Sequence, residues 1–220
     1  MPLLIEKLTV SPLQENCYLI GDETTREGII IDPGDEPRRI VDAVERLGLY
    51  VRKIVNTHGH VDHIAAAEDV KEALGATLHL HPGDEMYLPN IAENARLFGL
   101  SAGRTPRVDM FLRDGMEIPF GAQTLIVHHC PGHTPGHCLL RVGDDVFCGD
   151  LVFSGSIGRT DLPGGDYGTI VDSLERTILT LADEVRLHPG HGPSTTVAVE
   201  RKFNPFLQGL KPKENRGGPL

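Results

Sequence analysis

Several features are scarce in this sequence of 220 residues, and each scarcity argues against a class of protein. No apolar run reaches the length of about 18 residues that a membrane-spanning helix needs, so we predict none. Glu6 and Lys7 interrupt the N-terminus where a signal peptide needs an unbroken apolar stretch, and we expect a cytoplasmic protein. Lysine and arginine number 21 against 31 acidic residues, and the net charge of −10 disfavours a nucleic acid or an anionic membrane as a partner.

Cysteine is also scarce, and its spacing predicts no disulfide framework. None of the four cysteines forms a C-x-x-C pair, and without a sign of export we interpret all four as reduced thiols. Cys130 is the one alternative nucleophile among them, but it directly precedes Pro131 and we expect it to be buried. The four are Cys17, Cys130, Cys138 and Cys148.

The rest of the composition is that of an ordinary globular chain with an excess of histidine. Apolar residues make up 40% and charged residues 24%, which predicts one domain over residues 1–208 with a loose tail over 209–220. Histidine occurs 11 times and glycine 25 times. Because histidine is the commonest metal ligand in proteins, histidines that cluster along the chain would indicate a metal site.

Predicted strands and helices alternate, and several strands end in a histidine or aspartate next to glycine. This regularity places polar groups from distant parts of the chain at one edge of a sheet. The segment 85–100 is poorly periodic. We predict helices over 37–47, 64–74 and 169–181, and strands that include 53–56, 77–80, 123–129, 184–187 and the hairpin 139–142/145–148.

The densest group of candidate ligands is His58-x-His60-x-Asp62-His63, between a predicted strand and a predicted helix. Alternate side chains of an extended loop share a face, so His58, His60 and Asp62 can converge, and the turn into the helix brings His63 beside them. Four ligands within six residues can serve two metal ions.

Three further candidates follow other strands, namely His133, Asp150 and His191. Together the seven residues offer five imidazoles and two carboxylates, which suit zinc, iron, cobalt or manganese better than magnesium or calcium. We predict two divalent ions, with Asp150 bridging them and zinc favoured over iron or manganese. Asp62 and Asp150 are thereby the predicted catalytic carboxylates.

The order of these motifs resembles the metallo-β-lactamase superfamily, and within it the glyoxalase II (hydroxyacylglutathione hydrolase) branch. The resemblance runs from Gln14 to Gln208 and includes the run 153–161, although the helical C-terminal domain of the full-length enzymes has no counterpart here. It implies an α/β fold, an αββα sandwich of two mixed sheets flanked by helices with the metals at one edge. By the same resemblance, His58, His60 and His133 hold one metal, Asp62, His63 and His191 hold the other, and Asp150 bridges them.

The resemblance also implies an activity, which is hydrolysis of a small thioester such as S-lactoylglutathione by a hydroxide shared between the two ions. Two alternatives stay open. Persulfide dioxygenases of the superfamily carry the Gly158-Arg159-Thr160-Asp161 sequence too and use a single iron, and a promiscuous ester or lactone hydrolase would use the same site.

Four residues outside the ligand set have weaker predicted roles. Arg159 stands where the family places a cation that reaches a substrate carboxylate, and we predict that it binds substrate. His137 is a candidate for orienting a ligand, Asp32 at a strand end is a candidate hydrogen-bond acceptor, and Tyr167 is a candidate for the mouth of the site.

Overall fold

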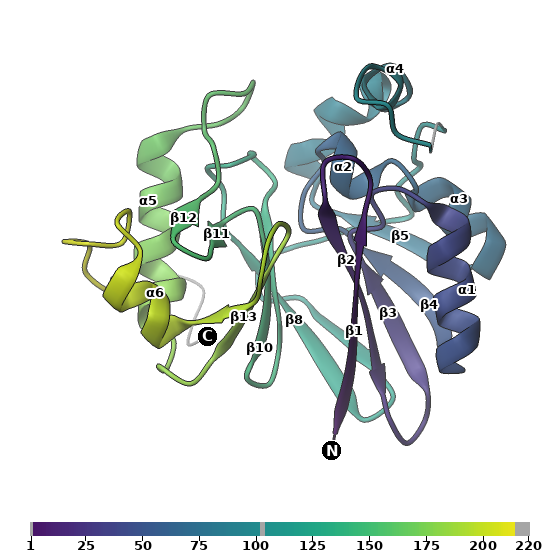
Figure 1. Cartoon of the computed structure of the whole chain (residues 1–220), viewed down its shortest axis with the longest axis horizontal. Helices are drawn as coiled ribbons and strands as arrows, with labels where there is room; N and C mark the ends of the chain where they lie inside the picture. The colour runs from purple at the N-terminus through teal and green to yellow at the C-terminus, as the bar shows by residue number, and fades with distance from the viewer. Residues whose placement is uncertain (1, 102–103, 214–220) are drawn as a thin grey trace.

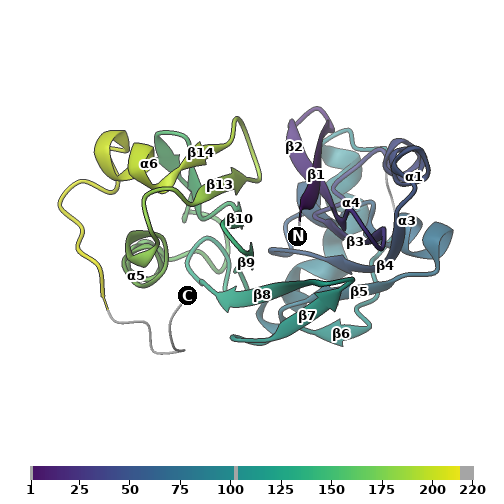
Figure 2. The same cartoon turned by 90° about the horizontal axis from the view of Figure 1, so that it is seen from below.

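Two mixed β-sheets face each other, and helices cover the outer face of each (Figures 1 and 2). The computed structural model describes residues 2–101 and 104–213. This arrangement is the αββα sandwich that the sequence motifs imply, so the predicted fold class is confirmed. Within the described residues, no helix is long and apolar enough to cross a membrane.

The N-terminal half forms the first sheet, in the strand order β1-β2-β3-β4-β5-β6. An antiparallel meander, β1 to β3, leads into parallel strands, β3 to β6. The strands are β1 (Leu3–Val10), β2 (Glu15–Asp22), β3 (Glu27–Ile31), β4 (Tyr50–Val55), β5 (Thr77–Leu80) and β6 (Met110–Phe111), and the helices of this half are α1 (Pro37–Leu47), α2 (Val61–Ile64), α3 (Ala67–Leu74), the 3₁₀ helix η1 (Pro82–Asn90) and α4 (Ile91–Leu97).

The C-terminal half forms the second sheet, in the order β14-β13-β10-β9-β8-β7, together with the small ribbon β11-β12. The predicted hairpin is present as the antiparallel pair β9 and β10. The strands are β7 (Glu117–Phe120), β8 (Gln123–His129), β9 (Cys138–Val142), β10 (Asp145–Gly149), β11 (Val152–Phe153), β12 (Ser156–Ile157), β13 (Arg186–Pro189) and β14 (Thr195–Thr196), and the helices are α5 (Tyr167–Arg176), η2 (Ile178–Thr180) and α6 (Val197–Phe203).

Alternation along the central strands places one apolar set between the sheets and another under the helices. Ile29 and Ile31 of β3 belong to the inter-sheet cluster with Phe147 of β10, whereas Ile30 packs with the residues of α1 and α3. Successive strand residues point to opposite faces, which explains why these strands are apolar without interruption. A third apolar cluster, which includes Leu139 of β9 and Leu174 of α5, packs the helices of the C-terminal half on the second sheet, so apolar layers lie between the sheets and under the helices on both sides.

The helix predicted over 64–74 is wrong in its boundaries, because the chain forms two helices, α2 and α3, with a break at Ala65 and Ala66. The Ala66 N–H donates to the carbonyl of Pro33 at 3.1 Å instead of to the preceding helical turn. Gly34 lies so close to the Asp62 carbonyl oxygen that a Cβ there would be 1.6 Å from it. The loop after β3 thus packs into the break and fixes the direction in which Asp62 and His63 point.

Other boundaries also differ from the predictions. The helix predicted over 169–181 ends at Arg176 and is followed by η2, and the last predicted strand is shifted to Arg186–Pro189. The segment 85–100, which has no clear period, forms the end of η1 and then α4. In the predicted tail, Lys213 donates its backbone N–H to the Glu175 carbonyl of α5 and forms an ion pair with the Glu175 carboxylate. Residues 214–220 of that tail lie outside the described residues.

Candidate metal centre

The first half of the sandwich places four candidate ligands beside one another at the end of β4. His58 and His60 lie in the loop that follows this strand, and Asp62 and His63 lie in α2. His58 and His63 are fully buried, and their ring centroids are 4.1 Å apart. A short loop and a four-residue helix are therefore enough to gather the local motif.

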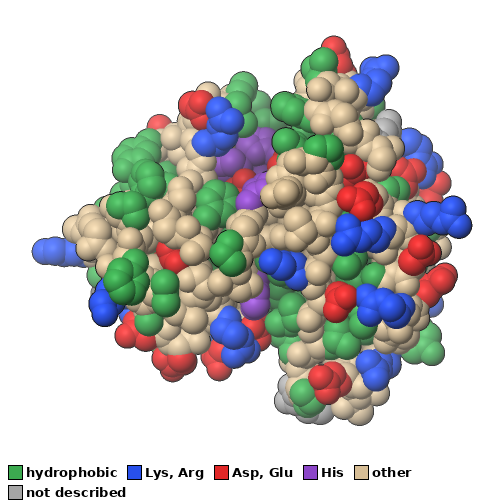
Figure 3. Space-filling model, viewed as in Figure 1, with side chains coloured by type: hydrophobic (Ala, Val, Ile, Leu, Met, Phe, Trp, Pro, Cys, Tyr) green, Lys and Arg blue, Asp and Glu red, His purple; other side chains and the backbone are tan. Residues whose placement is uncertain are grey.

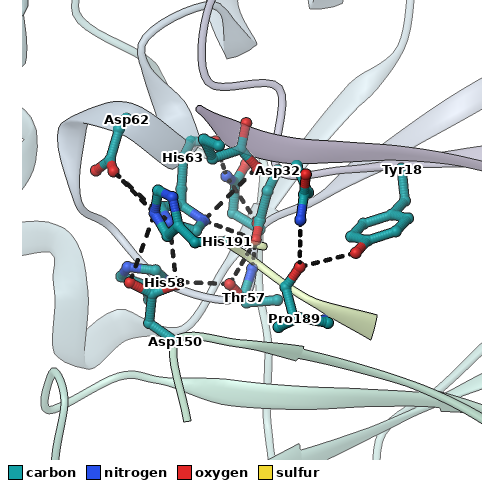
Figure 4. A network of polar contacts seen from close by, with 12 residues as sticks. Tyr18, Asp32, Thr57, His58, Asp62, His63, Asp150, Pro189 and His191 are labelled. Carbon is teal, nitrogen blue, oxygen red and sulfur yellow. Dashed lines mark hydrogen bonds and ion pairs between the residues drawn. The ribbon is translucent and has the colours of Figure 1, made fainter. Parts of the chain in front are cut away.

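The second half contributes three ligands from three separate loops, each after a strand end. His133 lies between β8 and β9, Asp150 follows β10, and His191 follows β13. The turn that carries His191 is held against β2, because the Pro189 carbonyl accepts hydrogen bonds from Tyr18 at 2.7 Å and Asn16 at 3.0 Å (Figure 4). Residues far apart in the sequence thus meet across the gap between the sheets.

Six of these seven side chains form two compact groups, one of His58, His60 and His133 and the other of Asp62, His63 and His191. Within each group the candidate ligand atoms lie within 4.8 Å of one another. Asp150 reaches both groups, since its Oδ2 is 3.5 Å from His133 Nε2 and its Oδ1 is 3.4 Å from His63 Nε2. The structure brings together all seven predicted ligands, in the two sets and with the shared carboxylate that the resemblance implies.

The ring nitrogens of the buried histidines face the centre of the cluster without a hydrogen-bond partner. Within the described residues, this holds for Nε2 of His58, His60, His63 and His133, and the Asp150 Oδ1 atom is buried without a partner as well. Buried polar atoms are rarely left unsatisfied in proteins, so a set that converges on one point calls for a missing partner. Imidazole and carboxylate donors at this spacing fit divalent transition-metal ions.

The other nitrogen of three of these rings is engaged, which fixes the form of the imidazole. His63 Nδ1 lies 3.0 Å from Asp32 Oδ2, and His133 Nδ1 lies 2.8 Å from the Arg159 carbonyl oxygen. His58 Nδ1 lies 3.0 Å from the hydroxyl oxygen of Thr57. Because that hydroxyl donates its own proton to Asp32, it accepts from His58, and each of the three rings keeps a lone pair on Nε2 for a metal.

Burial and the carboxylates act in opposite directions on the histidines of the cluster. Burial would lower the pKa of His63 and of His191, but the nearby carboxylates of Asp62 and Asp150 raise both above the usual value. Burial lowers the pKa of His58 well below its usual value, and it lowers the pKa of His60 to about 4, with the neighbouring histidines adding to both effects. Burial alone would raise the pKa of Asp150, but the nearby His63, His133 and His191 lower it below the usual range. Metal coordination requires neutral imidazoles, so His58 and His60 are already in the ligating form, whereas a metal bound by His63 and His191 would displace protons from their rings.

Asp32 orients two of the candidate ligands at once. Its Oδ2 accepts from the Thr57 hydroxyl at 2.6 Å as well as from His63, and its Oδ1 accepts from the Thr57 N–H at 2.7 Å (Figure 4). His137 contacts a ligand in a different way from the predicted donor, since its Nε2 accepts from the backbone N–H of Asp150 at 3.1 Å. Asp32 therefore orients His58 and His63 through side-chain hydrogen bonds, whereas His137 holds Asp150 through its backbone N–H.

Sequence reasoning missed two buried acids of the site, Asp84 and Glu15. The Asp84 carboxylate accepts from the N–H groups of Gly59 and Gly136 and from the Thr134 hydroxyl, at 2.6–2.8 Å, and so ties the loops of both sheets together. Its signal was present, because Asp84 also follows a strand and a Pro-Gly pair. Glu15 is fully buried 3.8 Å from His63, and burial raises its pKa well above the usual value.

The remaining predicted residues lie around the cluster or away from it. Arg159 lines the cavity over the cluster, but its side chain is 61% exposed and its guanidinium makes two hydrogen bonds to Asp161. Tyr167 is exposed on α5 and is not a lining residue of that cavity. Cys130 is fully buried, and burial raises its pKa to about 12, so its thiol is protonated at neutral pH.

Comparison with known proteins agrees with this geometry. Residues 10–191 match the family model of the metallo-beta-lactamase superfamily. The chain belongs to the metallo-β-lactamase superfamily. The superfamily includes metal-dependent hydrolases, and the candidate ligands of this chain lie together at one edge of its sandwich.

Relatives within the superfamily carry different names. Hydroxyacylglutathione hydrolase GloC of Haemophilus influenzae is 37% identical over 212 residues, covering 92% of this chain and 97% of the relative. Human mitochondrial persulfide dioxygenase ETHE1 is 33% identical over 214 residues, covering 94% of this chain and 76% of the relative. The solved structure of TTHA1623 in a di-iron-bound form is 42% identical with a TM-score of 0.82, covering 92% of this chain and 100% of that one.

Proposed function

We propose that this superfamily member uses two divalent metal ions to hydrolyse thioesters. Thioester hydrolysis is the reaction that the name of one relative, hydroxyacylglutathione hydrolase, describes. The observation that carries the proposal is the pair of adjacent ligand groups that share Asp150. Two bound divalent ions would supply an activated water at neutral pH and would polarise a carbonyl oxygen. Zinc and iron both suit the donor set, and iron is the metal named for one solved relative.

The chain's own residues would hold the reacting groups in place and require no covalent intermediate. Water adds to the thioester carbonyl, the carbon–sulfur bond breaks, and the products are a carboxylic acid and a thiol that recovers a proton from solvent. The carboxylates of Asp62 and Asp150 lie at the base of the cavity, where they would orient the water. Arg159 at the rim carries the positive charge that would meet an anionic group of the thiol.

The experiment that tests the proposal measures thiol release from S-lactoylglutathione by protein loaded with zinc, iron or manganese. We expect turnover that a chelator removes and that a metal restores, together with two ions bound per chain. His58→Ala should lose both the activity and metal affinity, whereas the matched variant His128→Ala, outside both ligand groups, should keep both. A protein that binds two ions and cleaves no member of a thioester panel would refute the proposal.

A second candidate function is persulfide dioxygenation. It is favoured by the 33% identity to ETHE1 and by the run from Gly158 to Asp161, which resembles the sequence of persulfide dioxygenases. Metal stoichiometry and oxygen consumption separate the two reactions. A single iron per chain with oxygen uptake on glutathione persulfide would support the dioxygenase, and hydrolysis without oxygen uptake would support the proposed thioesterase.

A further inference from the structure

An apolar wall stands over the metal centre, and we define it as Leu13, Met86, Ile91, Phe98, Leu162 and Pro163. Four of its members are large side chains left open to solvent, with Leu13 and Leu162 both 37% exposed, Met86 54% and Phe98 52%. They come from the β1–β2 loop, from η1 and the end of α4, and from the loop before α5. Exposed apolar side chains that gather on one site mark a surface that binds something.

The wall and the candidate ligands line the same cavity. Its volume is about 570 Å³, and His60, Asp62, His133, Asp150 and His191 form its base. Figure 3 shows histidine side chains in a hollow between the two halves, with hydrophobic side chains beside it. A pocket of this size with apolar walls and a few polar groups is the usual form of a small-molecule site.

Tyr87 joins the two sides of the wall and connects it to the metal centre. Its hydroxyl donates to the Pro163 carbonyl at 2.6 Å, which links η1 to the loop before α5. Its ring packs edge-on to His60 with centroids 5.1 Å apart. The apolar surface therefore begins beside a candidate ligand and continues outward to the loop before α5.

Charge on the lining argues against a strongly anionic substrate group along this wall. Among the described lining residues, Arg159 is the one lysine or arginine, so it can meet at most one anionic group of a substrate. Asn90 and Asn94, one helical turn apart, are the polar side chains on the helical side of the cavity. Glutathione carries two carboxylates, so most of its charge would find no cation here, whereas an apolar chain would find a matching surface.

We propose that the preferred substrates of this site are thioesters whose acyl group is an extended apolar chain, longer than a three-carbon lactoyl group, which lies along the apolar wall. This proposal rests on the proposed hydrolase function, and it specifies which side of the thioester the cavity selects. The carbonyl is placed at the ligand cluster, the acyl chain runs past Tyr87 towards Phe98, and the polar thiol leaves past Arg159 at the open rim.

The test compares two series of thioesters on the metal-loaded protein. In the first series the thiol is N-acetylcysteamine and the acyl group is acetyl, butanoyl, hexanoyl or octanoyl. In the second series the acyl group is acetyl and the thiol carries alkyl chains of the same lengths. Each methylene buried against the wall should raise kcat/KM by about fourfold in the acyl series, with no comparable rise in the thiol series.

A matched pair of variants assigns the effect to the wall. Phe98→Ala should lower the ratio of octanoyl to acetyl kcat/KM by about fifteenfold, the equivalent of roughly two buried methylenes. Leu97→Ala, the adjacent residue of α4, is 75% exposed and is not a lining residue, so its ratio should match the unaltered protein. Both side chains are exposed, and circular dichroism should report two folded proteins.

Binding of S-alkyl N-acetylcysteamine thioethers, which cannot be hydrolysed, gives a readout without turnover. Calorimetry should show tighter binding with each added methylene and a negative heat-capacity change. Hydrolysis of all thioesters at a rate independent of acyl length, or a rise with thiol length instead, overturns the inference and leaves the hydrolase proposal intact. Absence of hydrolysis overturns the hydrolase proposal and the substrate assignment that rests on it; chain-length-dependent thioether binding would then keep only the apolar wall as a binding surface, and the absence of both would overturn that as well.

Discussion

Replacing Asp32 by asparagine separates the orientation of the metal ligands from the ligands themselves. Asp32 Oδ2 accepts from two donors, the His63 ring and the Thr57 hydroxyl, and that hydroxyl in turn accepts from His58. An asparagine side chain has the same shape but presents an NH₂ group in place of one oxygen. The donors that the two oxygens of Asp32 now accept, the His63 ring and both the hydroxyl and the N–H of Thr57, would then compete for one oxygen, and His58 and His63 would lose their fixed tautomers.

The expected magnitude follows from the way such partners act on metal ligands. Loss of a hydrogen-bonded acceptor behind a ligating histidine costs about 10–100-fold in metal affinity, or about 1.4–2.7 kcal/mol. Asp32 supports one histidine of each ligand group, since His58 belongs to the first and His63 to the second. We therefore expect both ions to bind more weakly in Asp32→Asn, rather than one of them alone.

The assay is competition for zinc between the protein and a chromophoric chelator, with thermal unfolding measured on the same samples. Asp22→Asn is the matched control, because Asp22 is also buried and accepts from the N–H groups of Thr24, Thr25 and Ala122, yet contacts no candidate ligand. The control should lose stability without losing metal affinity. Unchanged affinity for both ions in a folded Asp32→Asn protein would refute the reasoning.

Three further outcomes are expected. Burial raises the pKa of the Cys130 thiol to about 12, so this thiol should play no part in catalysis. Cys130→Ala should keep its thioesterase activity, and iodoacetamide should not inhibit the unaltered protein. Loss of activity in a folded variant would point to a role for the thiol. Burial would raise the pKa of Asp145, but His188 and Arg186 lower it to about 2, below its usual 3.8. Its carboxylate therefore stabilises the fold above about pH 4, and this contribution is lost as the pH falls towards 2. The urea midpoint of Asp145→Asn should depend less on pH across that window than the midpoint of the unaltered protein, and equal slopes would contradict the assignment. Asp84→Ala leaves the buried N–H groups of Gly59 and Gly136 without an acceptor, and urea unfolding should show that the free energy of unfolding falls by about 2–6 kcal/mol. A much smaller fall would mean that water replaces the carboxylate.

The parts of the structure that could be predicted from the sequence are those that local chemistry decides. The helix over Pro37–Leu47 begins with proline and ends at Gly48 in a left-handed conformation, which are signals within the segment itself. His58, His60, Asp62 and His63 lie within one short loop and helix, so their convergence needs no distant contact. The other ligands were predicted from their common place after strand ends.

The parts that could not be predicted depend on contacts between distant segments. The break after α2 is caused by the Pro33 carbonyl and Gly34, which no pattern within 64–74 reveals. The role of Asp84 depends on N–H groups 25 and 52 residues away. Glu15 is the first residue of β2, and nothing in the local sequence marks it as a site residue. Only the packing of the β1–β2 hairpin against His63 makes it part of the site.

Neither sheet can build the metal centre alone, because each ligand group draws on both. His58 and His60 come from the first sheet and need His133 from the second, whereas Asp62 and His63 need His191. The shared carboxylate, Asp150, also comes from the second sheet, and the two sheets are held in register by the apolar layer between them. Ligand geometry therefore depends on the docking of the two halves, and Asp84, which binds loops of both, fixes that docking at the edge where the ligands meet.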